Sequence, residues 1–327
     1  MSEADPTPEQ EGLEELLLGE RPSLTRVEVA EAAGVPVEVA QELWRLLGFP
    51  ATSDDDVAFT TADVEALRLA ADLTGLGILG DDSRSALVRT WGRSFARLAE
   101  WQTTLMARVA AADPDADPAA QLAMLTGEVI PRVERLQSYV WRRHLTSAAG
   151  RRLAGSEGPS TNETTRQAVA FVDIVGFTSQ SRSMREAELV GWIETFESRS
   201  TEVVVDHGGR VIKNIGDEVL LVADTPAAAA RIVHLLVTMG ADEDDPFPAV
   251  RAGVAYGDVV TRLGDVLGAT VNIAARLTSL ARPGTVLVDD GMREELEDSP
   301  VWSLRRVPRA SVKGYSSLRP WALRHRD

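Results

Sequence analysis

The stretch FVDIVGFTS, from Phe171 to Ser179, decides how the second half of this chain folds. Its apolar residues lead to Asp173, which predicts a buried strand that ends in a carboxylate. The Gly-Phe-Thr sequence that follows predicts a turn with exposed backbone N–H groups. A second carboxylate, Asp217, lies in the segment KNIGDEVL, which begins at Lys213. Two carboxylates at neighbouring strand ends, beside a turn that can hold phosphate, suggest metal-assisted phosphoryl chemistry.

Around this stretch, short apolar runs alternate with amphipathic helices from residue 167 onward, which is the pattern of an α/β or α+β domain. The segment PAVRAGVAYGDVV is expected to form one strand that breaks at Gly257. A helix is expected to begin near Ala269, and it places Asn272 and Arg276 one turn apart on the same face. The polar groups that could bind a ligand are therefore concentrated in residues 167–327.

The first half of the chain is predicted to be almost entirely helical, with a long helix from Asp82 to about Ala111. Aromatic residues recur there at helical spacing, which most often indicates a core; a lipid-sized pocket or a dimer face are the alternatives. The segment from Leu153 to Arg166 is rich in Gly, Ser and Thr, so it is expected to be a linker. The predicted organisation is a helical domain at 1–152, a linker at 153–166 and a second domain at 167–327.

Residues 20–75 contain a predicted helix-turn-helix with its turn at Gly34. DNA-binding proteins place the second helix of this motif in the major groove, but the corresponding helix here carries Glu38, Gln41 and Glu42. The motif is also a compact way to pack helices, and its acidic surface favours this structural interpretation. A DNA-binding regulator is the alternative.

Composition narrows the function classes. A chain of 327 residues is long enough for about two domains, and the absence of cysteine excludes disulfides and thiolate metal sites. The net charge of −16 argues against a nucleic-acid partner, because nucleic-acid binding usually needs a basic face. No apolar run approaches the roughly 20 residues that span a bilayer, and the acidic N-terminus does not resemble a signal peptide. These features predict a soluble cytoplasmic protein without a transmembrane segment.

Each candidate residue also has an ordinary structural explanation. Asp173 can cap a strand end, and Asp217 suits a hairpin turn. Lys213 can be an edge-strand charge that prevents aggregation. Asn272 and Arg276 can belong to a solvated helix face. Taken singly, none of the five indicates a function.

Taken together, three motifs in this half resemble those of the class III nucleotidyl cyclases. They are FVDIVGFT at 171–178, KNIGD at 213–217, and GDVLG at 264–268 followed by VNIAAR at 271–276. They occur in the family's order with its internal spacings, and the resemblance covers residues 167–327. It implies an α+β fold of ferredoxin-like type, preceded here by an all-α regulatory domain. The implied activity is that of an adenylyl cyclase, which converts ATP to 3′,5′-cyclic AMP and pyrophosphate.

The resemblance implies that Asp173 and Asp217 hold two divalent cations, Mg²⁺ or Mn²⁺, with help from the backbone carbonyl of Ile174. The N–H groups from Val175 to Thr178 are expected to contact phosphate, because they lie at the start of a predicted helix. The residues of this turn assigned to substrate binding are Gly176, Phe177 and Thr178.

The resemblance assigns the remaining site residues to the nucleotide. Lys213 and Asp265 read the purine edge, and they favour ATP because adenine offers an amino donor at C6 and an acceptor at N1. Asn272 orients the ribose, and Arg276 stabilises negative charge on the α-phosphate. Lys313 matches a lysine that contacts the terminal phosphates, although the motif around it is short.

The family builds its active site between two catalytic domains, so the resemblance also implies a homodimer. Asp173 and Asp217 come from one protomer, while Lys213, Asp265, Asn272 and Arg276 come from the other. One chain carries both sets, which gives two equivalent sites. The ribose 3′-oxygen is then expected to attack the α-phosphorus in line. A guanylyl cyclase and a catalytically silent nucleotide sensor are the alternatives.

The helical half is expected to control the catalytic pair and to take part in dimerisation, as in actinobacterial cyclases that respond to pH or lipid. His144 lies on the helix that enters the linker, among Arg142, Arg143 and Arg151. It is a candidate titrating group, and a surface histidine in a basic patch is the simpler interpretation. The regulatory ligand is expected to be a proton or a lipid.

Overall fold

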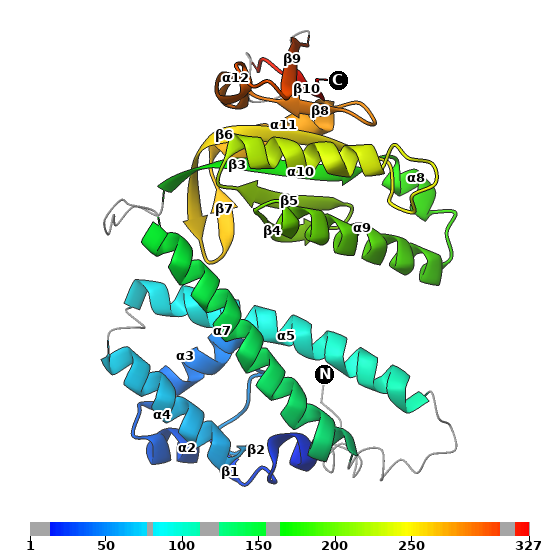
Figure 1. Ribbon diagram of the computed structural model, residues 1–327. Coiled ribbons are helices and arrows are strands. Elements are labelled where there is room, and N and C mark those ends of the chain that lie inside the picture. Colours follow the sequence, from blue (N-terminus) through cyan, green and yellow to red (C-terminus); the bar gives the residue numbers. More distant parts are fainter. Residues whose placement is uncertain (1–13, 77–80, 112–123, 155–163, 308–317, 327) are drawn as a thin grey trace. The chain divides into compact units, whose positions relative to one another are not determined.

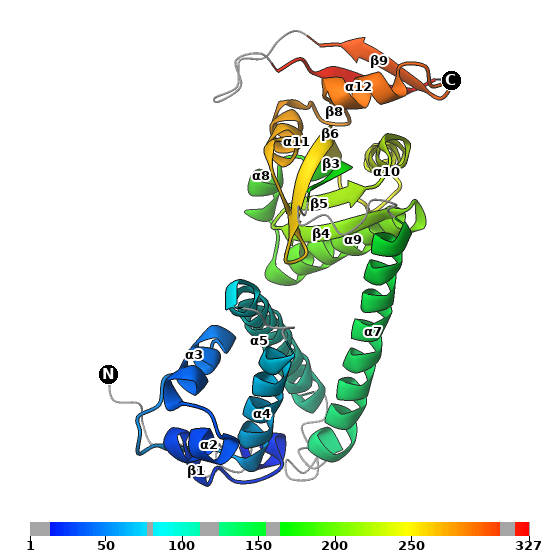
Figure 2. The same ribbon diagram turned by 90° about the vertical axis from the view of Figure 1, so that its left-hand side faces the viewer.

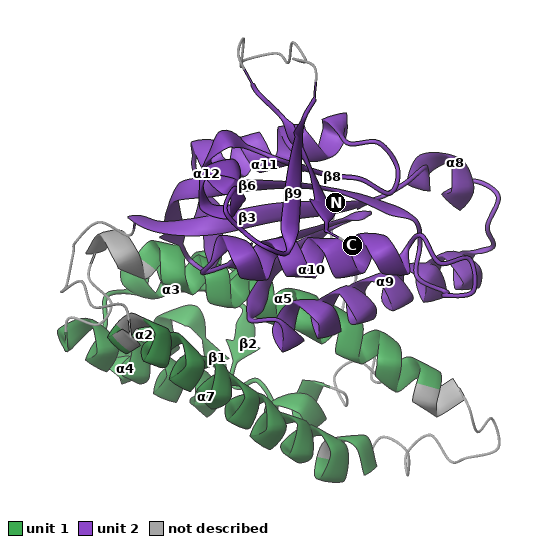
Figure 3. Ribbon diagram, turned by 45° about the horizontal axis from the view of Figure 1, so that its top comes forward, with its two compact units in different colours: residues 1–157 green, residues 158–327 purple. Residues whose placement is uncertain are grey.

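The computed structural model describes residues 14–76, 81–111, 124–154, 164–307 and 318–326. The chain divides into two compact units, residues 1–157 and 158–327 (Figure 3). The predicted linker at 153–166 lies largely outside the described residues, because 155–163 are not described. In the described part of the chain, no helix is long and apolar enough to cross a membrane.

Unit 1 contains a helix-turn-helix, as predicted, which follows a short helix at 14–18. Helix α2 (Arg26–Ala33) starts at Thr25, which exchanges capping hydrogen bonds with Glu28, and it ends at Gly34. Gly34 adopts a left-handed backbone with φ 73°, which glycine accepts without a steric penalty. Helix α3 (Val37–Leu47) follows, and Trp44 on it packs against Phe59 with ring centroids 4.5 Å apart.

The remaining elements of unit 1 are mostly helical, with one exception. The exception is a two-stranded sheet of β1 (Leu24–Thr25) and β2 (Val57–Phe59), which was not predicted. It forms because the chain reverses direction after α3 and the polar loop, so that Phe59 of β2 pairs with Leu24 of β1. The helices that complete the unit are α4 (Thr61–Gly75), α5 (Asp81–Ala111) and α7 (Ile130–Ala154), the last preceded by the π-helical turn η1 (Leu125–Val129) (Figure 1).

The expectation that the aromatic residues of α5 and α7 form a core is wrong. Phe95 and Trp101 on α5 are 58% and 63% exposed, and Trp141 on α7 is 60% exposed. The small buried cluster of the unit lies among α2, α3, α4 and β2 instead. Helix α5 approaches that cluster at Gly92, where a Cβ atom would lie 2.3 Å from the carbonyl oxygen of Leu47.

Unit 2 is built on an eight-stranded sheet in the order β4-β5-β3-β6-β8-β10-β9, with β7 paired to β6. Its strands are β3 (Thr164–Ile174), β4 (Gly209–Ile215), β5 (Glu218–Ala223), β6 (Val250–Arg262), β7 (Asp265–Leu267), β8 (Val286–Val288), β9 (Trp302–Arg306) and β10 (Trp321–His325). The helices are α8 (Phe177–Ser181), α9 (Glu186–Asp206), α10 (Pro226–Met239), α11 (Ala269–Leu280) and α12 (Asp290–Leu296). The succession β3-α9-β4-β5-α10-β6, with β3 and β5 between β6 and β4, is the predicted ferredoxin-like α+β arrangement.

Different helices pack against the two faces of the sheet. The larger core lies under α9 and α10, and the smaller one lies under α11 (Figure 2). Gly253 allows α11 to lie close to β6, because a Cβ atom there would be 2.2 Å from the backbone nitrogen of Thr278. The predicted break at Gly257 does not occur, since β6 continues through it and pairs it with Gln167 of β3.

Candidate functional site

Asp173 ends a buried strand, as the sequence predicts, and its side chain is surrounded by charge. It lies on β3, directly opposite Glu218 of β5 and Arg251 of β6. The residue is only 6% exposed, and the Nε and Nη2 atoms of Arg251 each lie 2.6 Å from its Oδ2. Burial raises the pKa of the Asp173 carboxyl, Arg251 opposes that rise, and the nearby Asp217 carboxylate adds to it.

Asp217 reaches the same end of the sheet from the turn between β4 and β5. Its backbone carbonyl accepts a hydrogen bond from the N–H of Ile174 at 3.0 Å, which joins the two carboxylate-bearing segments. The neighbouring Glu218 has a raised pKa, because it is partly buried and lies near the carboxylates of Asp173 and Asp217. Three acidic side chains are therefore close together at one end of the sheet, with Arg251 beside them.

The turn after Asp173 only partly suits the predicted phosphate contacts. The N–H of Val175 donates to the carbonyl of Ala249 at 2.8 Å, so this predicted donor is already used within the sheet. Gly176 adopts φ 70° and precedes α8, which begins at Phe177. The Phe177 ring stacks on Trp192 at 5.6 Å, so its side chain serves packing. Gly176, Phe177 and Thr178 stay candidates through their backbone N–H groups.

Lys213 and Asp265 are brought together, although 52 residues separate them in the chain. The Lys213 Nζ atom lies 2.5 Å from Oδ2 of Asp265, and both side chains are partly exposed. A second contact fixes the Asp265 side chain, because its Oδ1 accepts a hydrogen bond from the backbone N–H of Val266 at 2.9 Å. The strands β4 and β7 thus present one cationic donor and one carboxylate acceptor side by side to solvent.

Asn272 and Arg276 lie one turn apart on α11, and both are exposed. The opposite face of the helix carries Ala274, Leu277 and Thr278, which are buried against the sheet. Across the residues that the structure describes, no hydrogen bond or ion pair joins Asn272 or Arg276 to Asp173 or Asp217. Lys313 lies outside the described residues.

The donor set at the sheet end fits a hard divalent cation. Asp173, Asp217 and the Ile174 carbonyl all offer oxygen, which Mg²⁺ and Mn²⁺ prefer over nitrogen or sulfur. Within the described ranges, no group of three or more Asp, Glu, His or Cys side chains is arranged to hold a metal by itself. Mg²⁺ usually takes only one or two carboxylates and completes its shell with water and substrate phosphate, so the two aspartates fit a nucleotide-bound ion.

Sequence reasoning missed Arg251 and Glu218. Arg251 is the single charged residue in the otherwise apolar run VRAGVA, and that contrast was the available signal. Glu218 directly follows Asp217, and in the sequence it could be interpreted only as a residue of the same turn. Their roles depend on the strand register that places both beside Asp173.

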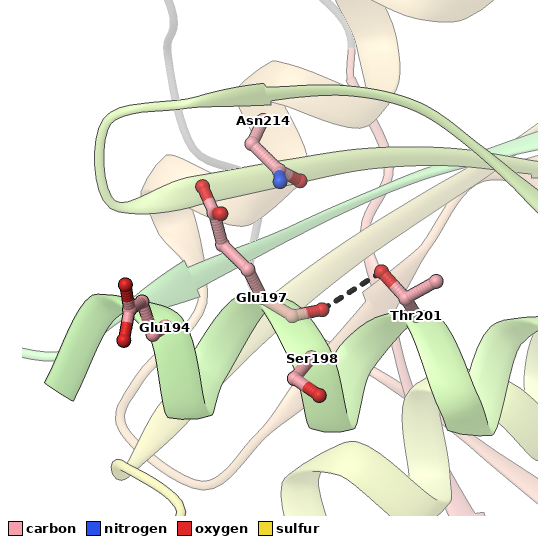
Figure 4. A pocket seen from close by; sticks show the side chains of 5 residues that line it. All are labelled: Glu194, Glu197, Ser198, Thr201 and Asn214. Atoms are coloured by element: carbon pink, nitrogen blue, oxygen red, sulfur yellow. Dashed lines mark hydrogen bonds between the residues drawn. The ribbon is translucent and has the colours of Figure 1, made fainter. Parts of the chain in front are cut away.

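A separate open hollow lies between α9 and β4 (Figure 4). It is lined by Glu194, Glu197, Ser198, Thr201 and Asn214. Asn214 neighbours Lys213 on β4, but consecutive strand residues point to opposite faces of a sheet. The two glutamates make the hollow unsuited to a triphosphate, and it contains none of the predicted site residues.

Comparison with known proteins identifies a family model, curated relatives and a solved structure that are similar to this chain. Residues 160–325 match the family model described as the adenylate and guanylate cyclase catalytic domain. A protein of Glutamicibacter nicotianae named adenylate cyclase is 38% identical and covers 95% of this chain and 81% of its own length. An adenylate cyclase of Streptomyces coelicolor is 38% identical and covers 96% of this chain and 89% of its own. The crystal structure of the adenylyl cyclase CyaB from P. aeruginosa aligns with 21% identity and a TM-score of 0.43, over 50% of this chain and 96% of that one.

Proposed function

The chain belongs to the adenylate and guanylate cyclase catalytic domain family, and we propose that it converts ATP to 3′,5′-cyclic AMP and pyrophosphate. The relatives named adenylate cyclase match it over nearly its whole length. The observation that carries the choice of substrate is the Lys213–Asp265 pair, held at 2.5 Å. A lysine donates to N1 of adenine while the carboxylate accepts from the amino group at C6. Guanine presents the reverse pattern, so the pair favours ATP over GTP.

Asp173, Asp217 and the Ile174 carbonyl are the residues that would hold the divalent cation. Bound Mg²⁺ or Mn²⁺, two ions in each complete site, would supply charge neutralisation for the reacting oxygens. The proposal is supported by the two carboxylates at one sheet end and by the hydrogen bond that joins their segments.

The other residues of the chain would hold and polarise the nucleotide. Lys213 and Asp265 fix the base, and Asn272 orients the ribose so that its 3′-oxygen faces the α-phosphorus. The 3′-hydroxyl gives up its proton to water, a bond forms between its oxygen and the α-phosphorus, and the bond from that phosphorus to pyrophosphate breaks. Arg276 stabilises the charge on the α-phosphate. Gly176, Phe177 and Thr178 contact phosphate through their N–H groups, and Lys313 contacts the terminal phosphates. Positioning and charge neutralisation account for catalysis, as elsewhere in phosphoryl transfer.

Two protomers would share each site. Asn272 and Arg276 are exposed on α11 and have no contact with Asp173 or Asp217 in the described part of one chain, which fits a partner that completes the site. Two-fold symmetry then gives two equivalent sites. Residues 1–152 would restrain or release this pair through the segment 153–166 and would add contacts between protomers. A proton or a lipid would be the signal.

Turnover of purified protein with ATP and with GTP, each with Mn²⁺, tests the proposal. Cyclic AMP is expected as the main product, with a higher kcat/KM for ATP. A preference for GTP would instead identify a guanylyl cyclase. Nucleotide binding without any cyclic product would identify a silent sensor.

A further inference from the structure

Two of the four histidines of this chain are in ring contact with each other in unit 2. His234 lies on α10 and His325 on β10, and their ring centroids are 5.4 Å apart with planes that differ by 17°. The Trp302 ring of β9 meets both at near right angles, with its centroid 5.5 Å from that of His234 and 5.6 Å from that of His325. Three rings from three elements therefore form one histidine–tryptophan cluster.

This cluster joins the C-terminal strands of the sheet to α10. Trp302 and His325 are direct partners in the β9–β10 pair, so their side chains lie on the same face. Trp302 is buried in the core under α10, whereas His325 is exposed. Strand β9 lies at the end of the sheet order, next to β10. The contacts of His234 with both strands therefore help to fix this end of the sheet to the helix.

The charged groups around the cluster do not compensate a protonated His234. Burial lowers the pKa of this imidazole, and the nearby His325 lowers it further; in the described part of the chain, no carboxylate counters this shift. The charged side chains on the contacting elements are Arg231 on α10, Arg305 and Arg306 on β9, Arg324 on β10 and Arg326 directly after it. Helix α12 also packs against α10; it and its C-cap carry Asp290, Glu294, Glu295 and Glu297, and Arg293 on the same helix pairs with the first, second and last of these. Protonation of both histidines therefore places two like charges side by side.

We propose that His234 and His325 form an acid-sensitive latch, which holds the β9–β10 pair on α10 while at most one imidazole is protonated and releases it when both are. This inference does not depend on the proposed function. In the released state His234 is solvated and regains an ordinary pKa of about 6.5, so that state binds the proton more readily than the closed one. The latch is therefore fully closed above about pH 6.5 and weakens as the pH falls below that value.

Hydrogen exchange of the full chain, followed by mass spectrometry at about pH 7.5, 6 and 5, measures this release directly. Exchange rates are converted to protection factors, because the chemical exchange rate itself changes with pH. Peptides from β9 and β10 are expected to lose protection about ten-fold or more between the highest and the lowest pH, since each unit by which the pKa is lowered favours release ten-fold in acid. Peptides from β3 and β5, in the interior of the sheet order, are expected to lose less.

Two phenylalanine variants separate charge from packing. His234→Phe keeps an aromatic ring beside Trp302 but cannot be protonated, so the loss of protection in acid is expected to shrink to that of β3 and β5. His325→Phe, at an exposed position, is expected to do the same, and it serves if His234→Phe does not fold in a thermal-unfolding control. His207→Phe is the matched control, because His207 ends α9 and its Nδ1 contacts the carbonyl of Val203 at 2.9 Å. It is expected to lose protection in β9 and β10 as the wild type does.

Proton NMR of the histidine ring C–H groups gives a second measurement on the same chain. The titration midpoint of His234 is expected to rise by about 0.5 pH unit or more in His325→Phe, because the variant removes a nearby charge. A midpoint that does not move would overturn the coupling between the two histidines. The latch would also be overturned if β9 and β10 lost no more protection in acid than β3 and β5, or if the loss were undiminished in both phenylalanine variants. None of these results bears on cyclic AMP formation, which tests the proposed function separately.

Discussion

One end of the sheet in unit 2 buries a charged side chain, whereas the long helices of unit 1 expose large apolar ones. In the sheet, Asp173 is buried next to Glu218, although carboxylates usually lie at the surface. On α5 and α7, Trp101 and Trp141 are exposed, although large aromatic side chains are usually covered. A buried carboxylate is typical of a site that keeps a negative charge in a fixed position. Exposed aromatic side chains are typical of a surface that binds another protein or another part of the same protein. This contrast supports the proposal that unit 2 carries catalysis and that unit 1 takes part in association.

The largest expected effect comes from the carboxylates. Asp217→Asn is expected to lower kcat/KM for ATP by roughly 10³-fold, because a charged cation ligand is worth several kcal/mol in phosphoryl chemistry. The fold should persist, since Asp217 is only partly buried in a turn. Cyclic AMP formation with Mn²⁺ is the measurement, and Asp206→Asn at the end of α9 is the control. Activity within ten-fold of the wild type would remove Asp217 from the site.

The aromatic residues of unit 1 give the sharpest contrast in stability. Trp44→Ala is expected to lower the free energy of unfolding by about 3–5 kcal/mol, because Trp44 is buried against Phe59. Trp101→Ser, at an exposed position, is expected to change it by less than about 0.5 kcal/mol and to weaken self-association. Denaturant unfolding and sedimentation of both variants check this. A large loss of stability in Trp101→Ser with unchanged association would contradict the proposed surface.

The base-reading pair is expected to show a smaller effect on catalysis. Lys213→Met removes the donor to N1 of adenine and leaves Asp265 without its partner. We expect kcat/KM for ATP to fall about 10- to 100-fold, with a smaller loss for GTP, because an unmet hydrogen bond in a polar site is costly. Assays with ATP and with GTP measure the ratio of the two kcat/KM values and its change in the variant. Asn214→Ala, on the other face of the same strand, should leave the ratio unchanged.

The smallest expected effect concerns Asp289, a half-buried acid outside the site. Burial raises the pKa of Asp289 to about 6, against the backbone hydrogen bonds that it accepts. The folded chain thus binds a proton more readily than the unfolded chain, so the Asp289 contribution destabilises folding above pH 6 and fades as the pH falls to about 4. Asp289→Asn keeps an acceptor at this helix cap and is expected to raise stability at pH 7.5 by roughly 1–2 kcal/mol.

Unfolding curves between pH 4 and pH 7.5 check this prediction. The Asp289→Asn variant should gain less stability than the wild type as the pH falls from 6 to 4. Asp298→Asn, an exposed position, is the control and should follow the wild type. Parallel curves for wild type and Asp289→Asn would show that the pKa of Asp289 is not raised in the folded chain.

The sequence pattern predicted a second domain of alternating strands and helices, with Asp173 near the end of its first strand, because apolar runs and turn residues are local signals. The ferredoxin-like arrangement was predicted from the family resemblance. That resemblance also grouped Lys213 with Asp265, and the structure does bring them together. Arg251 and Glu218 escaped notice because their proximity to Asp173 follows from strand register. The same limit applies to Gly257, where a local signal predicted a break but the ladder with β3 maintains the strand.

The exposed aromatics of α5 show the other limit of sequence reasoning. Helical spacing of Phe95 and Trp101 predicts that one face is apolar, but it says nothing about which body covers that face. The short β1–β2 pair escaped prediction for a related reason, since a two-residue strand has no periodicity to read. The periodicity of apolar residues thus predicts where helices and strands lie, whereas contacts between distant parts of the chain determine which side chains are buried.

A shared active site is the central claim, and complementation tests it most directly. Asp173→Ala and Arg276→Ala are each expected to be nearly inactive alone. Co-expressed in equal amounts, they should recover about one quarter of wild-type activity, because about half of the dimers are mixed and each mixed dimer has one of its two sites intact. Activity in the mixture no higher than in either variant alone, with mixed dimers present, would contradict a site built from two protomers.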